Sequence, residues 1–213
     1  MLIAEMLPAV AAEGLAEYVD VCCDEGFFTV EDTGRILEAA ARYGIRPKIH
    51  ANELANSGGV QVGIRHGALS VDHLERMEAA EIAALRESDT IPTMLPGASF
   101  FLGMPYAPAR AAVEAGLPVA LASDYNPGSS PSGDMRMVMA LACIKMRLTP
   151  REALVATTLN GAAAMGLGRE LGSIAVGKRA SFIVTRPVPS LAFIPYAYTT
   201  PFIAAHFIGG SKM

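Results

Sequence analysis

The sequence contains little cysteine and no tryptophan. Its 213 residues include three cysteines, and two of these, Cys22 and Cys23, are adjacent. Three cysteines in this arrangement do not make a disulfide framework, which argues against a small secreted scaffold. A reducing compartment is the simpler interpretation, and we therefore expect the protein in the cytoplasm.

Positive charge is also scarce. The chain has 17 Lys and Arg against 21 Asp and Glu, a formal net charge of -4. This balance gives no electrostatic footprint for nucleic acid, so we expect no nucleic-acid partner. The N-terminal residues include Glu5 and Pro8 and no basic leader, which is unlike a secretory signal.

Charge is missing altogether from two long segments, residues 90–109 and 187–211. Each contains four prolines. Proline interrupts helices, so neither segment is expected to cross a membrane, and we expect no membrane partner.

What the sequence does contain is a regular alternation of strand and helix patterns. Hydrophobic residues make up 52% of the chain and charged residues 18%, a balance typical of a chain that buries a large core. The predicted strands are 18–23, 46–50, 68–73, 90–95 and 118–123. The predicted helices between and after them are 29–43, 57–66, 77–87, 105–115, 133–147 and 149–165. Such a repeat predicts an α/β fold with a parallel sheet, and eight units of this kind close into a (β/α)8 barrel, of which about five are present.

The pattern changes near residue 171. Residues 174–184 read as a β-hairpin, and residues 202–208 as a last strand. We therefore expect residues 1–170 to belong to the barrel part and residues 171–213 to form a separate β segment.

Polar side chains stand at the ends of three predicted strands. His50 and His73 end two successive strands, and Asp124 follows the fifth. The carboxyl ends of strands carry the active site in a barrel, and imidazole with carboxylate is a common ligand set for a catalytic divalent metal. A lone histidine is more often a hydrogen-bonded core residue, but the coincidence of three strand ends favours a metal site.

Other residues near these strand ends have two interpretations. Glu53 is either a carboxylate at a helix start or a group for proton transfer. Asn126, Gly128 and Ser129 are either ordinary turn formers or ligand-binding groups in the turn after Asp124.

Several short segments of the sequence resemble those of the imidazolonepropionases, a family of metal-dependent amidohydrolases of histidine degradation. The matching segments are residues 48–53, 70–74, 95–102, 106–110 and 122–131, with residues 172–178 matching a tail signature of amidohydrolases in general. The resemblance covers nearly the whole chain.

The resemblance implies a (β/α)8 barrel, with residues 171–213 forming part of a small composite β-sandwich. It implies that His50 and Asp124 bind one divalent metal, Zn or Fe. Catalysis would fall to Glu53, His73 and Asp124, and substrate binding to Glu53, Asn126, Gly128 and Ser129. The family reaction is the hydrolytic opening of 4-imidazolone-5-propanoate to N-formimidoyl-L-glutamate.

One feature of the family is absent. Its members carry a His-x-His pair of metal ligands on the first barrel strand, whereas the histidines here are 50, 66, 73 and 206. We therefore expect the C-terminal half of a longer enzyme, acting as a homo-oligomer or together with the missing N-terminal half. The alternatives are another amidohydrolase, such as a cyclic amidase or deaminase, and a non-catalytic half-barrel that needs a partner chain.

Overall fold

The computed structural model describes residues 1–213, which divide into two units. The first contains residues 1–94 and 111–117, and the second contains residues 95–110 and 118–213. The division expected from the sequence, at residue 170, stays a prediction. Each unit is described below by itself.

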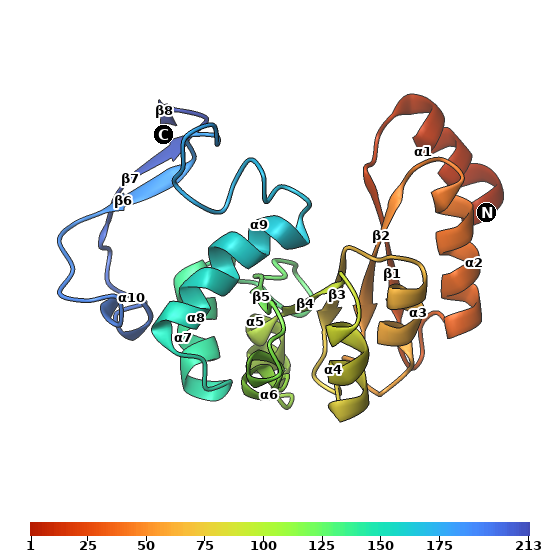
Figure 1. The fold of residues 1–213 in the computed structure, drawn as a ribbon, viewed down its shortest axis with the longest axis horizontal. Coiled ribbons are helices and arrows are strands. Elements are labelled where there is room, and N and C mark those ends of the chain that lie inside the picture. The colour runs from red at the N-terminus through yellow and green to blue at the C-terminus, as the bar shows by residue number, and fades with distance from the viewer. The chain divides into compact units, whose positions relative to one another are not determined.

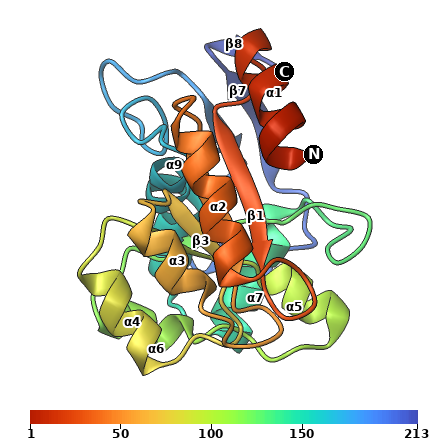
Figure 2. The same ribbon diagram turned by 90° about the vertical axis from the view of Figure 1, so that its right-hand side faces the viewer.

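The first unit is built on four parallel strands that pair in chain order. These are β1 (Tyr18–Cys23), β2 (Arg46–Ala51), β3 (Ser70–His73) and β4 (Ile91–Met94). Its helices are η1 (Leu2–Met6), α1 (Leu7–Glu13), α2 (Val30–Ala41), α3 (Gly59–Arg65) and α4 (Ala79–Arg86). Figures 1 and 2 show α2 running alongside β1, as expected for a strand–helix–strand unit. The predicted parallel α/β arrangement is confirmed here.

The two faces of this sheet differ sharply in polarity. The register pairs Cys22 with His50 and His50 with Asp72, so these three side chains lie in one row on one face. The opposite face is apolar and carries Ile49 and Val71, neither of which is exposed to solvent. Burial of each such side chain contributes about 1.5–3 kcal/mol. Burial of the apolar face therefore stabilises the sheet, and the polar face is available for a functional site.

Helix α3 packs closely on β2 because its first residue is a glycine. A Cβ on Gly59 would lie 2.7 Å from the Cβ of Ala51 and 2.9 Å from the carbonyl oxygen of Cys23. Any side chain here would push α3 away from the strand. The start of α2 is fixed by Thr29, whose hydroxyl accepts a hydrogen bond from the backbone N–H of Asp32.

The second unit carries one short strand, a series of helices and a small antiparallel sheet. Its helices are α5 (Pro96–Leu102), α7 (Met135–Lys145), α8 (Pro150–Val155), η2 (Ala156–Asn160), α9 (Gly161–Ala164) and α10 (Phe193–Tyr196). Its strands are β5 (Ala120–Leu121), β6 (Phe182–Thr185), β7 (Ile203–Ile208) and β8 (Ser211–Lys212). The chain passes between the units within α6 (Ala109–Glu114). Thr149 caps α8 in a capping box with Glu152, and Pro150 occupies its first turn.

The predicted hairpin over residues 174–184 is wrong. Residues 174–181 contain no strand, and β6 pairs instead with β7, about twenty residues further on; Figure 1 shows the two side by side. Lys178 explains the difference. Its Nζ donates to the backbone carbonyls of Gly168 and Leu171, and these bonds tie residues 174–181 to the segment that follows α9. Ile174 and Val176 are left exposed rather than paired.

Other boundaries also differ from the prediction. Helix α5 is not among the predicted helices: Pro96, which directly follows the strand predicted over 90–95, occupies the first turn of a helix. The strand expected over 118–123 is regular only at Ala120–Leu121, and the helix expected over 105–115 begins at Ala109. None of the helices combines the length and the apolar character that crossing a bilayer requires.

Candidate functional site

His50 stands on the polar face of the sheet, one residue before the end of β2. Its Nδ1 lies 2.8 Å from Oδ2 of Asp20 on the neighbouring strand β1. A neutral imidazole that donates from Nδ1 carries its lone pair on Nε2. The bond to Asp20 therefore presents Nε2 of His50 as the metal-ligating nitrogen.

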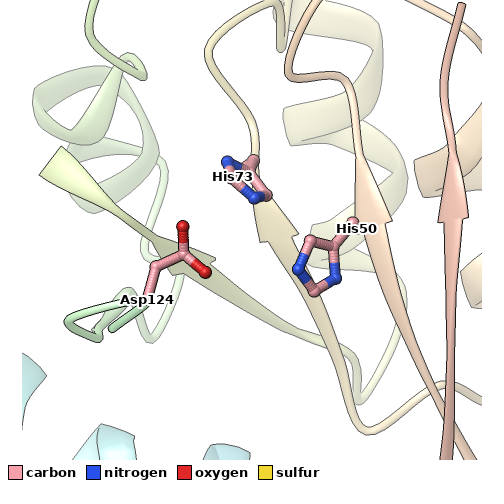
Figure 3. Close-up of side chains that lie close together, drawn as sticks. All are labelled: His50, His73 and Asp124. Carbon is pink, nitrogen blue, oxygen red and sulfur yellow. The ribbon is translucent and has the colours of Figure 1, made fainter. Parts of the chain in front are cut away.

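His73 reaches His50 through unusual backbone geometry. By register it pairs with Ala51 on the apolar side of the sheet, but its φ is +79° and that of Leu74 is +74°. A left-handed backbone is costly for a side chain with a Cβ, about 1–3 kcal/mol per residue. It turns the imidazole toward His50, with the ring centroids 5.0 Å apart, as Figure 3 shows. Strain of this kind is typical of functional sites.

Two carboxylates flank the buried imidazole of His73. Oε2 of Glu53 lies 3.6 Å from Nε2, and Oε2 of Glu75 lies 3.7 Å from Nδ1. Burial lowers the pKa of His73, but Glu75 and then Glu53 raise it by more, so that the net pKa lies above the ordinary value. The structure thus places Glu53 and His73 together, in a setting suited to proton transfer.

Asp24 holds the loop that carries Glu53. It is buried, and its carboxylate accepts hydrogen bonds from the backbone N–H groups of Glu53, Leu54 and Ala55 at 2.6, 3.0 and 3.1 Å. Its Oδ1 also accepts from the N–H of Glu25 at 2.7 Å. One side chain at the end of β1 therefore fixes the path of the chain after β2.

The end of β1 is electrostatically negative. Burial raises the pKa of the Cys22 thiol to about 11, and the charges of Glu53, Asp24 and Asp20 add to the shift. Burial also raises the pKa of Asp72, although Lys48 and the Ser70 hydroxyl oppose it. Repulsion among several carboxylates is relieved by a cation, so this edge of the sheet favours positive charge.

Asp124 belongs to the second unit and follows β5 (Figure 3). The turn after it is held by side-chain hydrogen bonds. Oδ1 of Asn126 accepts from the N–H groups of Gly128 and Ser129, both at 2.8 Å. Nδ2 of Asn126 donates to the backbone carbonyl of Asp124 at 2.7 Å and to Oγ of Ser129 at 2.9 Å. Oγ of Ser129 in turn donates to Oδ2 of Asp124 at 3.2 Å. The four residues singled out in this turn thus form one hydrogen-bonded unit.

The donor groups fit a divalent metal. An imidazole nitrogen whose tautomer is fixed by a carboxylate, and a carboxylate at a strand end, are ligands that Zn and Fe both accept. The negative surroundings of His50 add to this fit.

Four acidic residues of this region were not predicted: Asp20, Asp24, Asp72 and Glu75. A signal for three of them existed in the sequence. Asp20 and Asp72 each lie two residues from another polar residue, Cys22 and Ser70, in otherwise apolar strands, and a period of two marks one face of a sheet. Asp24 follows directly on β1, where the rule applied to the other strand ends would have found it.

A family model matches most of the sequence. The model of the amidohydrolase family matches residues 26–210. The chain belongs to the amidohydrolase family. Membership of this family agrees with the α/β fold expected from the alternating strands and helices of the sequence.

Curated relatives carry a more specific name. The chain is 52% identical over 210 residues to the imidazolonepropionase of Christiangramia forsetii, a match that covers 99% of this chain and 51% of the relative. It is 45% identical over 194 residues to the imidazolonepropionase of Shouchella clausii, covering 91% of this chain and 43% of the relative. The amidohydrolase chain thus spans about half the length of the curated relatives it matches.

Solved structures of similar fold are more distant in sequence. A zinc-bound adenosine deaminase from Xanthomonas campestris matches with a TM-score of 0.79 at 20% identity, covering 97% of this chain and 55% of that one. A mutant atrazine chlorohydrolase from Arthrobacter aurescens, complexed with zinc and atraton, matches with a TM-score of 0.80 at 16% identity, covering 99% and 55%. These matches confirm the amidohydrolase fold.

Proposed function

We propose that this amidohydrolase chain supplies half of an imidazolonepropionase, which hydrolyses 4-imidazolone-5-propanoate to N-formimidoyl-L-glutamate. The observation that carries the proposal is the 52% identity to such an enzyme across 99% of the chain. The strand-end residues support it, because each falls in a segment that resembles that family.

In this proposal His50 and Asp124 hold one divalent metal, Zn or Fe. Each stands at or just after the end of a strand, and the bond from His50 to Asp20 prepares its Nε2 for ligation. When bound, the metal supplies the positive charge that acidifies water near neutral pH.

Glu53, His73 and Asp124 handle protons. His73 lies between Glu53 and Glu75, which hold its ring in place and favour a proton on it. It can therefore donate a proton from Nε2, and Glu53 orients the substrate or accepts a proton in turn. Asp124 offers a carboxylate oxygen as a base.

Asn126, Gly128 and Ser129 bind the substrate together with Glu53. The turn presents polar groups and a glycine backbone that a small polar ring or a carboxylate can approach closely. Its hydrogen bonds fix these groups before the substrate arrives, which lowers the entropic cost of binding.

We also propose that the chain acts in the cytoplasm, where its three free cysteines suit a reducing environment. Its partners would be the small-molecule substrate and a polypeptide equivalent to the remaining half of the relatives. The alternative to that polypeptide is a second copy of the chain, in a homo-oligomer.

The test is reconstitution. The chain is mixed with the part of the Christiangramia forsetii enzyme that the match does not cover, and the loss of imidazolone absorbance is followed with Zn or Fe present. We expect no turnover by either half alone and turnover by the mixture. The chain offers two expected ligands, His50 and Asp124, with His73 as a possible third, and a catalytic metal needs three or four protein ligands in fixed geometry. A chelator should abolish the activity, and the mixture with Asp124→Ala should hold no tightly bound metal.

Two outcomes would contradict the proposal. Turnover by this chain alone, abolished by Asp124→Ala, would show that its site is complete without a second half. A reconstituted complex that hydrolyses other cyclic amides or deaminates bases, but leaves the imidazolone intact, would assign a different amidohydrolase reaction. Size exclusion shows whether the halves associate, which separates an inactive complex from no complex.

A further inference from the structure

We propose that Asp20 is a positioning residue that holds the His50 imidazole as the tautomer protonated on Nδ1, so that Nε2 carries the lone pair for a metal. The inference rests on the proposed function in one respect, namely that His50 is a metal ligand. No resemblance used above assigns a role to Asp20.

The geometry of the hydrogen bond carries the inference. Nδ1 of His50 and Oδ2 of Asp20 are 2.8 Å apart, a normal length for a charge-assisted hydrogen bond. Asp20 lies two residues before Cys22, which pairs with His50 in the register, so both side chains project from the same face of adjacent strands. A carboxylate only accepts, which leaves Nδ1 of a neutral imidazole as the donor.

The bond matters because it selects one of two forms of the ring. A neutral histidine side chain in water prefers the proton on Nε2, which is the form that cannot ligate a metal through that atom. Carboxylate partners of ligating histidines reverse this preference and fix the orientation of the ring. Asp20 would act in this way before any metal arrives.

A second carboxylate lies close by and serves as a matched control. The ligand atoms of Asp20, His50 and Asp72 all lie within 4.8 Å of one another. Asp72 is bound elsewhere, however, because its Oδ1 accepts from the Ser70 hydroxyl at 2.6 Å, and Nζ of Lys48 donates to that hydroxyl at 2.6 Å. The structure therefore assigns the tautomer of His50 to Asp20 and not to Asp72.

The first test needs no metal. The full chain is labelled with ¹⁵N-histidine, and long-range ¹H–¹⁵N correlation is recorded about two pH units above the ordinary histidine pKa of about 6.5, so that the rings are neutral. The His50 signal is assigned with His50→Gln. We expect a proton on Nδ1 in the parent chain, and a shift toward the Nε2-protonated form in Asp20→Ala and in Asp20→Asn.

The variants separate positioning from folding. Asp20→Asn keeps the size of the side chain but can donate its amide N–H to Nδ1, which favours the wrong tautomer. Asp20→Glu restores the carboxylate, and Asp20 is exposed enough, at 41%, to allow the longer side chain. We expect Asp20→Glu and Asp72→Asn to keep the proton on Nδ1. A proton on Nε2 in the parent chain, or an unchanged tautomer in Asp20→Asn, would overturn the proposal.

The second test adds the metal alone. Co²⁺ is titrated into the reconstituted complex of parent and variant chains, and binding is followed by the visible spectrum. We expect Asp20→Asn to bind about 10–100-fold more weakly, the usual effect of removing such a partner, and Asp72→Asn to bind like the parent. Equal affinity of Asp20→Asn and parent, despite a changed tautomer, would show that the bond does not serve metal binding. If Co²⁺ leaves the His50 signal of the parent untouched, the ligand assignment fails, and the result of the first test still decides the tautomer.

Discussion

The backbone N–H of Glu53 donates a 2.6 Å hydrogen bond to the carboxylate of Asp24, the residue directly after β1. Two further N–H groups of the same loop bind the same carboxylate. A buried acceptor with several donors fixes a loop that has no regular structure of its own, because loss of the acceptor leaves every donor unsatisfied. The position of Glu53 beside His73 is therefore set by a residue 29 positions earlier.

Replacement of Asp24 by alanine should both destabilise the first unit and disturb the site. We expect Asp24→Ala to lower the free energy of unfolding by about 2–4 kcal/mol, the cost of leaving buried polar groups without a charged partner. Urea unfolding followed by circular dichroism measures the change. In the reconstituted enzyme the same variant should lower kcat, because Glu53 loses its fixed place beside His73.

The neighbouring Glu25 is the matched control for Asp24. Its side chain is exposed, so Glu25→Ala should change the free energy of unfolding by no more than about 0.5 kcal/mol. Equal stability of the two variants would mean that the hydrogen bonds to Asp24 are replaced by water at little cost.

The buried carboxylate of Glu81, in the first turn of α4, gives a pH-dependent prediction. Glu81 is 3% exposed and accepts from Nε2 of Gln61 at 2.7 Å and from the N–H of Glu78 at 2.9 Å, where it caps α4. Burial raises its pKa, but these hydrogen bonds lower it by more, so the net pKa lies below the ordinary value. A pKa lowered by folding stabilises the fold above the unfolded-state pKa, about 4.3, and this contribution is lost as pH falls through the folded-state pKa.

Glu81→Gln should remove that dependence. We expect it to cost about 1–2 kcal/mol at neutral pH, as loss of a helix cap does, and to lose less stability than the parent chain on acidification. Urea unfolding at about pH 7 and about pH 3.5 measures both values. Glu38→Gln, an exposed substitution on α2, should follow the parent at both pH values. A constant difference between Glu81→Gln and the parent would refute the lowered pKa.

Strands could be predicted from the sequence wherever an apolar run ended in a polar residue. This rule located the strands of the first unit to within about two residues. It works because a buried strand needs apolar residues on at least one of its faces, and often on both. It failed for the hairpin at 174–184, because the partner of β6 lies about twenty residues further along the chain, and because Lys178 ties the residues before β6 to the segment after α9. A local sequence pattern does not indicate which strands will pair when they lie this far apart along the chain.

The site was only partly predictable for a related reason. His50, His73 and Asp124 could be named because they mark strand ends, whereas the partners of the histidines could not. Asp20 is 30 residues from His50, and their contact depends on the register of β1 with β2. The turn of His73 toward His50 depends on a positive φ, which no residue type at that position signals.

The turn after Asp124 yields the last prediction, which separates substrate binding from metal binding. Asn126→Ala removes five hydrogen bonds: three that Oδ1 accepts, from the N–H groups of Gly128 and Ser129 and from the Ser129 hydroxyl, and two that Nδ2 donates, to Asp124 and Ser129. If Asn126 serves the substrate, the reconstituted variant should keep its full metal content and show a KM raised about tenfold, equivalent to about 1.4 kcal/mol of lost uniform binding. Metal analysis and initial rates measure the two quantities.

Two further variants define what each result means. Pro127→Ala changes an exposed residue of the same turn and removes none of the hydrogen bonds of the Asn126 side chain, so it should alter neither metal content nor KM by more than about twofold. Asp124→Ala should lose the metal, since it removes a ligand rather than a neighbour. Loss of metal from Asn126→Ala as well would show that the turn acts by holding the Asp124 carboxylate, through the backbone carbonyl and Ser129, and would move Asn126 from substrate binding to support of the metal ligand. Retained metal with an unchanged kcat/KM would remove Asn126 from both roles, because a group that binds the substrate cannot be deleted without a change in kcat/KM.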